Sequence, residues 1–135
     1  MRRSRVVARR LTELPVYARA LAFGTAVSAI VRTPALRRDF KLTAQITTAA
    51  DSISANIEEG FEQGTDKAFA RYLNIAKGSL AETLGHLRRA SGKGYLSPAD
   101  LDPFVRDGDA LGRMLGGFIK YLHHSDFKDR GHHDP

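Results

Sequence analysis

Apolar residues recur along most of the chain at steps of three and four, and no stretch alternates convincingly with a period of two. Steps of three and four place side chains on one face of an α-helix, whereas a period of two marks a half-buried strand. The clearest stripe lies between residues 39 and 59 and consists of Leu42, Ile46, Ala49, Ile53 and Ile57. The pattern therefore predicts an all-α protein.

Capping residues give the bounds of the first helical segment, which we expect over residues 12–33. Thr12 is a suitable N-cap, Pro15 is tolerated in a first turn, and Pro34 follows the predicted end. We expect its buried side to include Tyr17, Leu21, Ile30 and Val31.

Three further segments follow, and glycines and caps separate them. Gly60 stands where a left-handed C-terminal cap of the segment 39–59 is expected. Thr65 is a good N-cap for a segment over residues 66–91, whose stripe consists of Phe69, Leu73, Ala76, Leu80, Thr83 or Leu84, and Leu87. Ser97 followed by Pro98 starts the last segment, whose stripe consists of Leu101, Phe104, Gly108, Leu111, Leu115, Phe118 and Leu122.

Four helices with short connections bury their apolar stripes most simply against one another. We therefore expect an antiparallel up-and-down four-helix bundle over residues 12–124. A basic arm, residues 1–11, precedes it, and a polar, His-rich tail, residues 125–135, which we expect to be loose, follows it.

Glycines inside the helices are the first feature that a plain bundle does not explain, since glycine weakens a helix interior. In the third segment Gly78 and Gly85 share a face, opposite the apolar stripe, with Ile75, Ser79 and Glu82. In the last segment three glycines recur at steps of four residues and form a glycine ladder: Gly108, Gly112 and Gly116. We interpret both sets as surfaces where another backbone approaches closely, in a self-associating protein. The alternative is that a stable bundle tolerates them.

A polar face in the second segment is the other such feature. Ser52, Asn56 and Glu59 lie about 100° from its apolar stripe. Asn and Ser weaken a helix interior unless their hydrogen bonds are used. These side chains are expected to bond to the third segment or to a neighbouring subunit; the alternative is a solvated face.

The length and charge of the chain narrow the classes of function. Its 135 residues make one domain, and the absence of cysteine excludes a disulfide scaffold and thiolate chemistry. Lys and Arg number 21 against 15 acidic residues, and five of these cations lie in the acid-free first ten residues: Arg2, Arg3, Arg5, Arg9 and Arg10. Such an arm suits an anionic partner, nucleic acid or a membrane surface, and the alternative is a solvated leader.

Two further basic clusters stand at predicted helix junctions. They consist of Arg37, Arg38 and Lys41, and of Arg88, Arg89 and Lys93. Each cluster by itself is explained by solubility alone, but both clusters repeated around an oligomer would form a multivalent basic surface. No aromatic-rich platform accompanies them, so we expect binding driven by charge and shape with little sequence readout.

The chain carries little that suits a membrane or an enzyme. The longest uncharged stretch, residues 20–31, is too short for a membrane helix, and Glu13 and Pro15 weaken its likeness to a signal peptide, so we expect a cytoplasmic protein. Glu82 and His86 form a single E-x-x-x-H pair, not a di-iron set. The tail residues that could bind zinc lack ordered spacing: His123, His124, Asp126, His132, His133 and Asp134. We therefore expect no catalysis, no cofactor and no metal.

Two motifs resemble a known family. Residues 52–60, S-I-S-A-N-I-E-E-G, are similar to the S-I-x-x-N-I-A-E-G signature of the 23S rRNA intervening-sequence proteins, and residues 76–82, A-K-G-S-L-A-E, to their A-x-G-S-L-x-E. Residues 42–45, L-T-A-Q, match its L-T-x-Q, and the likeness covers about residues 14–123. Glu58 departs from the pattern, which has alanine there. The motif positions are expected to make structural or subunit contacts: Gln45, Ser52, Asn56, Glu59, Gly60, Ile75, Gly78, Ser79 and Glu82.

The resemblance implies a four-helix bundle that assembles as a homopentameric ring and has no reaction centre. The same superfamily includes Avd, the accessory protein of diversity-generating retroelements, which is thought to engage a reverse transcriptase and its RNA through a basic surface. We therefore expect a non-catalytic accessory protein that binds structured RNA or DNA. The alternative is a protein–protein scaffold for a partner such as a reverse transcriptase, with nucleic acid incidental.

Overall fold

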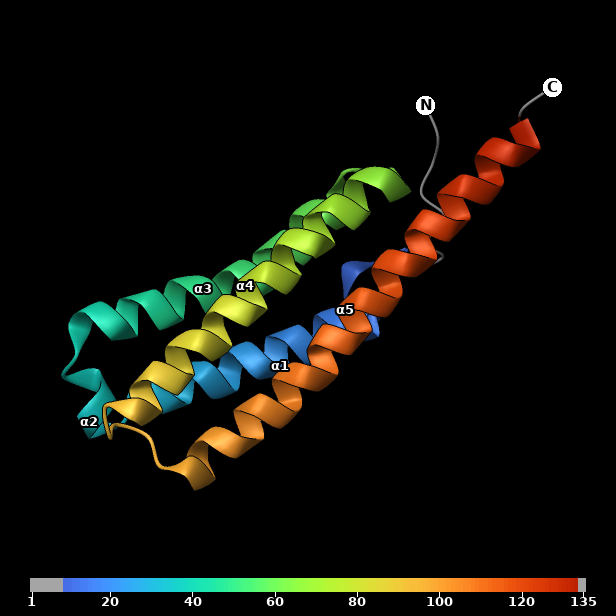
Figure 1. The fold of residues 1–135 in the computed structure, drawn as a ribbon. Helices are drawn as coiled ribbons and strands as arrows, with labels where there is room; N and C mark the ends of the chain where they lie inside the picture. The colour runs from blue at the N-terminus through green and yellow to red at the C-terminus, as the bar shows by residue number, and fades with distance from the viewer. Residues whose placement is uncertain (1–8, 134–135) are drawn as a thin grey trace.

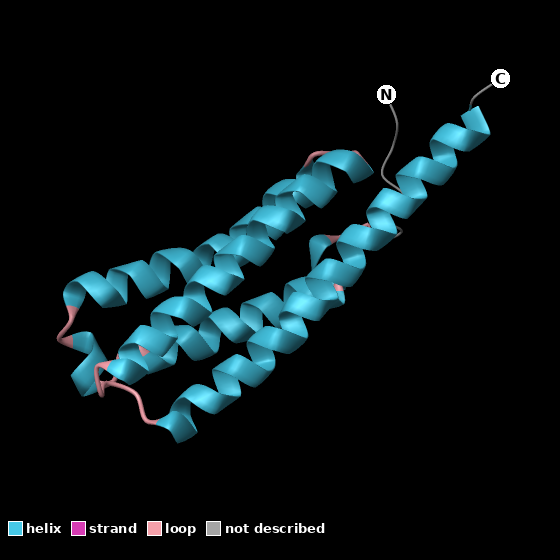
Figure 2. Cartoon of the chain, in the orientation of Figure 1, coloured by secondary structure: helices cyan, strands magenta, loops and turns pink. Residues whose placement is uncertain are grey.

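The structure, a computed structural model, describes residues 9–133. A short 3-10 helix, η1, is followed by five α-helices, and no strand occurs within these residues (Figure 2). The elements are η1 (Leu11–Glu13), α1 (Pro15–Ile30), α2 (Pro34–Arg37), α3 (Phe40–Glu62), α4 (Asp66–Gly92) and α5 (Pro98–His133). The predicted all-α class is confirmed.

The four long helices pack as a bundle in which successive helices run in opposite directions (Figure 1). α3 lies against α4, α4 lies against α5, and α1 touches both α3 and α5. The short α2 lies at the end of the bundle where α1 stops and α3 starts (Figure 1). None of the helices in the described part of the chain is long and apolar enough to span a membrane.

The core forms where the predicted stripes meet. The α3 stripe is buried along its whole length, and so is the α4 stripe, including both Thr83 and Leu84. Phe69 lies at the centre of an aromatic cluster, with its ring edge-on to Phe61 at 6.1 Å and to Phe118 at 5.2 Å. Fully burying a side chain of this size contributes about 1.5–3 kcal/mol, so the stripes dominate the stability of the fold.

The first helix differs from its prediction. It begins at Pro15 with Leu14 as the N-cap residue, so Thr12 does not cap it, and its buried residues are Val16, Ala20, Phe23 and Val27. Leu21, predicted to be buried, is 43% exposed, while Tyr17 and Ile30 are half-buried and only Val31 is buried as expected. The reason is that α1 carries apolar residues on every face, so its own sequence does not specify which face turns inward.

The short helix α2 was not predicted. Pro34 starts it, as proline does at a first helical position, rather than merely following α1. Leu36 is fully buried, and its carbonyl accepts a 2.8 Å hydrogen bond from the Thr43 hydroxyl of α3. These two contacts fix the corner between α2 and α3.

Gly60 does not form the predicted C-cap. α3 continues through it to Glu62, and the left-handed residue of this loop is Gly64, with φ +81°. Gly60 is buried, and a Cβ there would lie 2.8 Å from Phe69 Cδ1 and 2.8 Å from Tyr72 Cβ. The glycine is therefore required by the close approach of α3 to α4.

The other predicted caps are present. The Thr65 hydroxyl accepts from the backbone N–H of Ala68 at 3.2 Å, and the Ser97 hydroxyl accepts from that of Asp100 at 3.1 Å. Gly94 takes the left-handed conformation, with φ +81°, in the turn between α4 and α5.

The last helix is longer than predicted. Residues 125–133, which we expected to be a loose tail, continue α5 without a break (Figure 1). Extending an existing helix costs far less than starting one, and no proline interrupts this stretch.

Candidate nucleic-acid interface

The fold brings the two basic junctions predicted from the sequence to the same end of the bundle. One junction joins α2 to α3, and the other joins α4 to α5. The hydroxyl of Tyr95, in the second junction, donates a 3.2 Å hydrogen bond to Asp39 Oδ2 in the first. Because α3 and α4 run antiparallel, residues 56 positions apart in sequence meet here (Figure 1).

Asp39 is the acidic centre of this contact. Its other carboxylate oxygen caps α3 by accepting from the Leu42 backbone N–H at 3.0 Å. That backbone bond lowers the pKa of Asp39, and the Tyr95 hydroxyl and the charges of Lys93 and Lys41 lower it further. The pKa of Tyr95 is raised, first by its hydrogen bond to the Asp39 carboxylate. The Asp39 carboxylate therefore makes its hydrogen bonds within the protein: it caps α3 and binds Tyr95 of the second junction.

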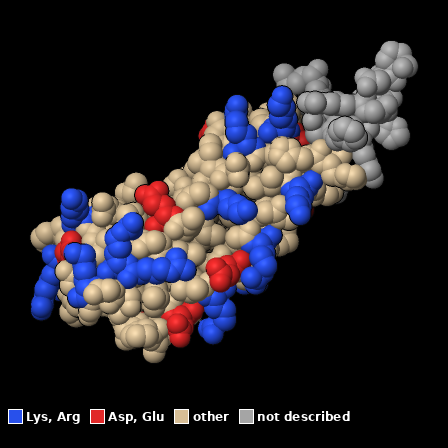
Figure 3. Space-filling model, in the orientation of Figure 1, with Lys and Arg blue, Asp and Glu red and all other residues tan. Residues whose placement is uncertain are grey.

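Seven cations lie in the two junctions or at the helix ends next to them, and we call them together the basic end. All seven side chains are exposed: Arg32, Arg37, Arg38, Lys41, Arg88, Arg89 and Lys93. Within residues 32–41 and 88–100 the acids are only Asp39 and Asp100. Figure 3 shows Lys and Arg gathered on the end of the molecule where α2 lies, with few acidic side chains among them.

Arg89 is partly oriented by its own helix. Its Nη1 donates to His86 Nδ1 at 3.0 Å, and His86 Nε2 faces a Glu82 carboxylate oxygen at 3.4 Å. If Nδ1 accepts from Arg89, Nε2 carries the proton and points it at Glu82. The pair of Glu82 and His86 is thus a helix-surface contact that positions an arginine.

The two arginines of the N-terminal arm that the structure describes lie away from the basic end. Arg9 and Arg10 precede α1, and α1 spans about 24 Å from their end of the molecule to the α2 end. The backbone N–H groups of both arginines donate to Glu13 Oε1, at 2.9 and 2.7 Å. Arg2, Arg3 and Arg5 lie outside the described residues.

One residue next to the basic end was not predicted as a site residue from the sequence. Phe40, the first residue of α3, is 83% exposed and stands between Asp39 and Lys41. Its exposure could have been predicted from the sequence. At about 100° per residue, Phe40 is about 200° from Leu42 and so lies opposite the buried stripe.

The polar face of α3 makes hydrogen bonds within the chain. Ser52 Oγ lies 2.9 Å from Ser79 Oγ on α4, and the Asn56 amide donates to Ser52 Oγ at 2.9 Å and to the Ser52 carbonyl at 2.7 Å. Ser79 is buried, so it does not lie on the outer face of α4 where we placed it. Glu59 is exposed and accepts from Gln63, and Gln45 is exposed.

Glu58, the departure from the family signature, also has an internal partner. Its carboxylate accepts a 2.8 Å hydrogen bond from the Tyr17 hydroxyl on α1. This bond is the main reason that the pKa of Tyr17 is raised, with desolvation and the Glu58 charge acting in the same direction. The extra charge therefore ties α1 to α3.

The outer face of α4 is open. A Cβ at Gly78 would meet nothing within 4 Å, Ile75 is 47% exposed, and the Glu82 side chain is 61% exposed. Gly85 differs, because its nearest neighbour is the Arg89 guanidinium at 3.6 Å. A side chain at Gly78 would thus meet nothing within the described part of the chain, and about half of Ile75 is open to solvent.

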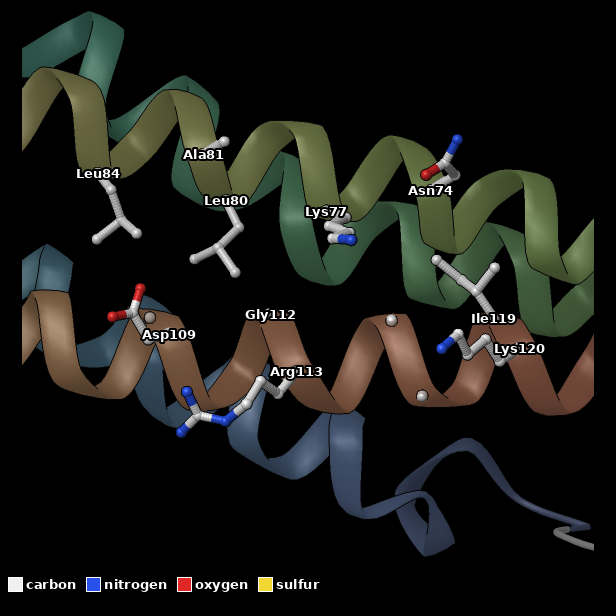
Figure 4. A pocket seen from close by; sticks show the side chains of 13 residues that line it. Asn74, Lys77, Leu80, Ala81, Leu84, Asp109, Gly112, Arg113, Ile119 and Lys120 are labelled. Atoms are coloured by element: carbon white, nitrogen blue, oxygen red, sulfur yellow. The ribbon is translucent and has the colours of Figure 1, made fainter.

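The glycine ladder of α5 borders a groove of about 830 Å³ between α4 and α5 (Figure 4). A Cβ at Gly108 would lie 2.8 Å from Leu84 Cδ1, so the Leu84 side chain would have to move, whereas Gly112 and Gly116 have only ordinary contacts. The groove is lined by Leu80 and Ile119, by three cations and by one acid; the charged residues are Lys77, Arg113, Lys120 and Asp109. Among the described residues, no three His, Asp or Glu side chains are grouped so that they could hold a metal.

The chain is similar in sequence to one protein family and in fold to a solved structure. The sequence model of the 23S rRNA-intervening sequence proteins matches residues 12–117. A solved structure from Bacteroides thetaiotaomicron, a protein of unknown function from the S23 ribosomal protein family, is similar with a TM-score of 0.71 and 23% identity. The similarity covers 78% of this chain and 98% of that one, and at this identity it shows the fold alone. No curated protein matches the sequence.

Proposed function

The chain belongs to the 23S rRNA-intervening sequence protein family, and we propose that it is a non-catalytic accessory protein that binds RNA or DNA through the basic end. The single observation that supports this function is the meeting of two basic junctions around Asp39 and Tyr95. Seven exposed cations at one end of the bundle supply the positive charge that contacts with a phosphate backbone need.

The internal use of Asp39 strengthens the proposal. An acid in a phosphate-binding surface ordinarily opposes binding, but the carboxylate of Asp39 already accepts from Leu42 and Tyr95. The cations around it are exposed to solvent, and of these Arg89 also donates to His86. The proposed assembly is a homopentamer, as in the family resemblance, and such a ring would repeat the basic end and raise its avidity.

A salt series tests the proposal. Binding of a labelled structured RNA and of a duplex DNA is measured by filter retention, for the wild type and for Arg37→Gln combined with Arg38→Gln. We expect the pair of substitutions to lower affinity and to reduce the slope of log affinity against log salt by about 2.

The matched control removes the same charge at the opposite end of α4, by Lys67→Gln combined with Arg71→Gln, both exposed positions. It should leave the affinity nearly unchanged. Absence of binding by the wild type at about 50 mM salt, where phosphate contacts are strongest, would remove the proposal.

A second candidate function is a protein–protein scaffold, and the open outer face of α4 together with the α4–α5 groove favours it. Light scattering tests the multimer that this function needs. Gly78→Arg should lower the molar mass while leaving the helix content unchanged, because the chain itself offers room for the larger side chain. Gly24→Arg on α1, also in open space, is the control. A monodisperse wild-type species of 14.9 kDa at high concentration would exclude the multimer.

A further inference from the structure

Phe40 is the most exposed large hydrophobic side chain among the described residues, at 83%. The other phenylalanines whose side chains the structure describes each make ring contacts at distances of 5.2–6.3 Å: Phe23, Phe61, Phe69, Phe104 and Phe118. Full burial of a phenylalanine contributes about 1.5–3 kcal/mol, and Phe40 forgoes most of this contribution. The packing of this chain therefore does not explain an aromatic residue at the start of α3.

The backbone on both sides of Phe40 is held in place. Before it, Leu36 is fully buried and its carbonyl accepts from Thr43 at 2.8 Å. Beside it, Asp39 accepts from the Leu42 N–H at 3.0 Å and from the Tyr95 hydroxyl at 3.2 Å. Because the corner is fixed, the ring is presented to solvent from a rigid support, which lowers the entropy lost when a ligand binds to it.

The surroundings of the ring select the kind of partner. Arg37 and Arg38 precede it by three and two residues and Lys41 follows it, and all three side chains are exposed. A basic or strongly apolar protein surface would have to desolvate these cations without pairing them. A ligand with negative charges next to flat apolar faces satisfies both the cations and the ring, and a nucleotide chain has that combination.

Resting on the proposed function, we propose that Phe40 stacks on an unpaired nucleobase, so that the basic end binds single-stranded segments in preference to duplex. In a duplex each base is covered on both faces by its neighbours, whereas loops, bulges and single strands leave faces free. Stacking on an aromatic ring is tolerant of base identity. The surface would therefore distinguish single strands from duplexes, but not one base sequence from another. The inference adds base stacking to the charge- and shape-driven binding that we expected from the sequence.

Fluorescence anisotropy with the full-length protein tests the inference. The probes are a single-stranded RNA of about 12 nucleotides, a duplex of the same length and a strand of the same length without bases. We expect Phe40→Ala to weaken binding of the single strand about tenfold, while binding of the duplex and of the baseless strand changes by less than about twofold. Phe40→Trp should retain the affinity for the single strand, and Leu21→Ala, at another exposed apolar residue, should not change it.

The outcomes separate this inference from the proposed function. Equal loss for all three probes, or no loss for any, overturns stacking, as does a change of molar mass in Phe40→Ala, which would make Phe40 a subunit contact. If Arg37→Gln with Arg38→Gln weakens binding of every probe and Phe40→Ala weakens none, only the stacking fails. If the wild type binds none of the probes, the proposed function fails with it.

Discussion

The hydroxyl of Tyr17 on α1 donates a 2.8 Å hydrogen bond to the carboxylate of Glu58 on α3. α1 is the helix whose inward face the sequence specifies least, since apolar residues occur all round it. A directional bond at its first turn therefore helps to fix its rotation against α3. The family signature has alanine where this chain has Glu58, so this contact is a particular feature of this chain.

Tyr17→Phe should lower the free energy of unfolding by about 1 kcal/mol, which is below the range for hydrogen bonds to charged groups because the pair is only partly buried. Urea denaturation measures it. Glu58→Ala provides a double-mutant cycle, and zero coupling energy between the two positions would contradict the bond. Since the pKa of Tyr17 is raised, this stabilisation is present below about pH 10 and is lost as pH rises through the folded-state pKa.

Gly60→Ala should destabilise the fold by about 1–3 kcal/mol through overpacking. The added Cβ would lie 2.8 Å from Tyr72 Cβ, an atom next to the backbone that cannot move without shifting α4. The thermal unfolding midpoint reports the effect. Gly117→Ala, at an open mid-helix position, is the control and should stabilise by about 0.5–1 kcal/mol. Equal stabilisation by both substitutions would show that α3 and α4 are not in close contact at Gly60.

Ser52→Ala should cost about 1–3 kcal/mol, because it removes the hydroxyl that faces the buried Ser79 on α4. Adding Ser79→Ala should recover part of the loss, since it removes the hydroxyl that Ser52→Ala leaves without its partner, and Asn56 keeps its bond to the Ser52 carbonyl. Chemical denaturation of the two single variants and the double variant checks this. A double variant less stable than the sum of the single losses would refute the pairing.

The stabilisation from Asp39 should depend on pH in a direction set by its lowered pKa. The carboxylate caps α3 in its ionised form, so its contribution is present above about pH 4 and is lost as pH falls through the lower folded-state pKa. In urea denaturation at a series of pH values, Asp39→Ala should be less stable than the wild type at neutral pH, and the two should converge in acid. A difference that is constant with pH would show that the charge has no part in the cap.

The basic end could be predicted only in part. The clusters at Arg37 and at Arg88 were recognisable because unpaired charges at helix junctions are visible in any sequence. Their meeting was not, since it depends on which helices are adjacent, and the Tyr95–Asp39 bond joins residues 56 positions apart. The exposure of Phe40 could be predicted from its position opposite the buried stripe, but a phenylalanine in an amphipathic helix is ordinarily taken as a core residue.

The sequence by itself determined the class of the fold, the strong stripes of α3, α4 and α5, and the caps at Thr65 and Ser97, because these depend on interactions among residues near in sequence. The tertiary structure alone decided which face of α1 turns inward, that Gly60 serves close packing and not a cap, and that Ser79 faces α3. Each of these depends on the distance and orientation of a second helix. The local pattern of apolar and polar residues does not contain that information.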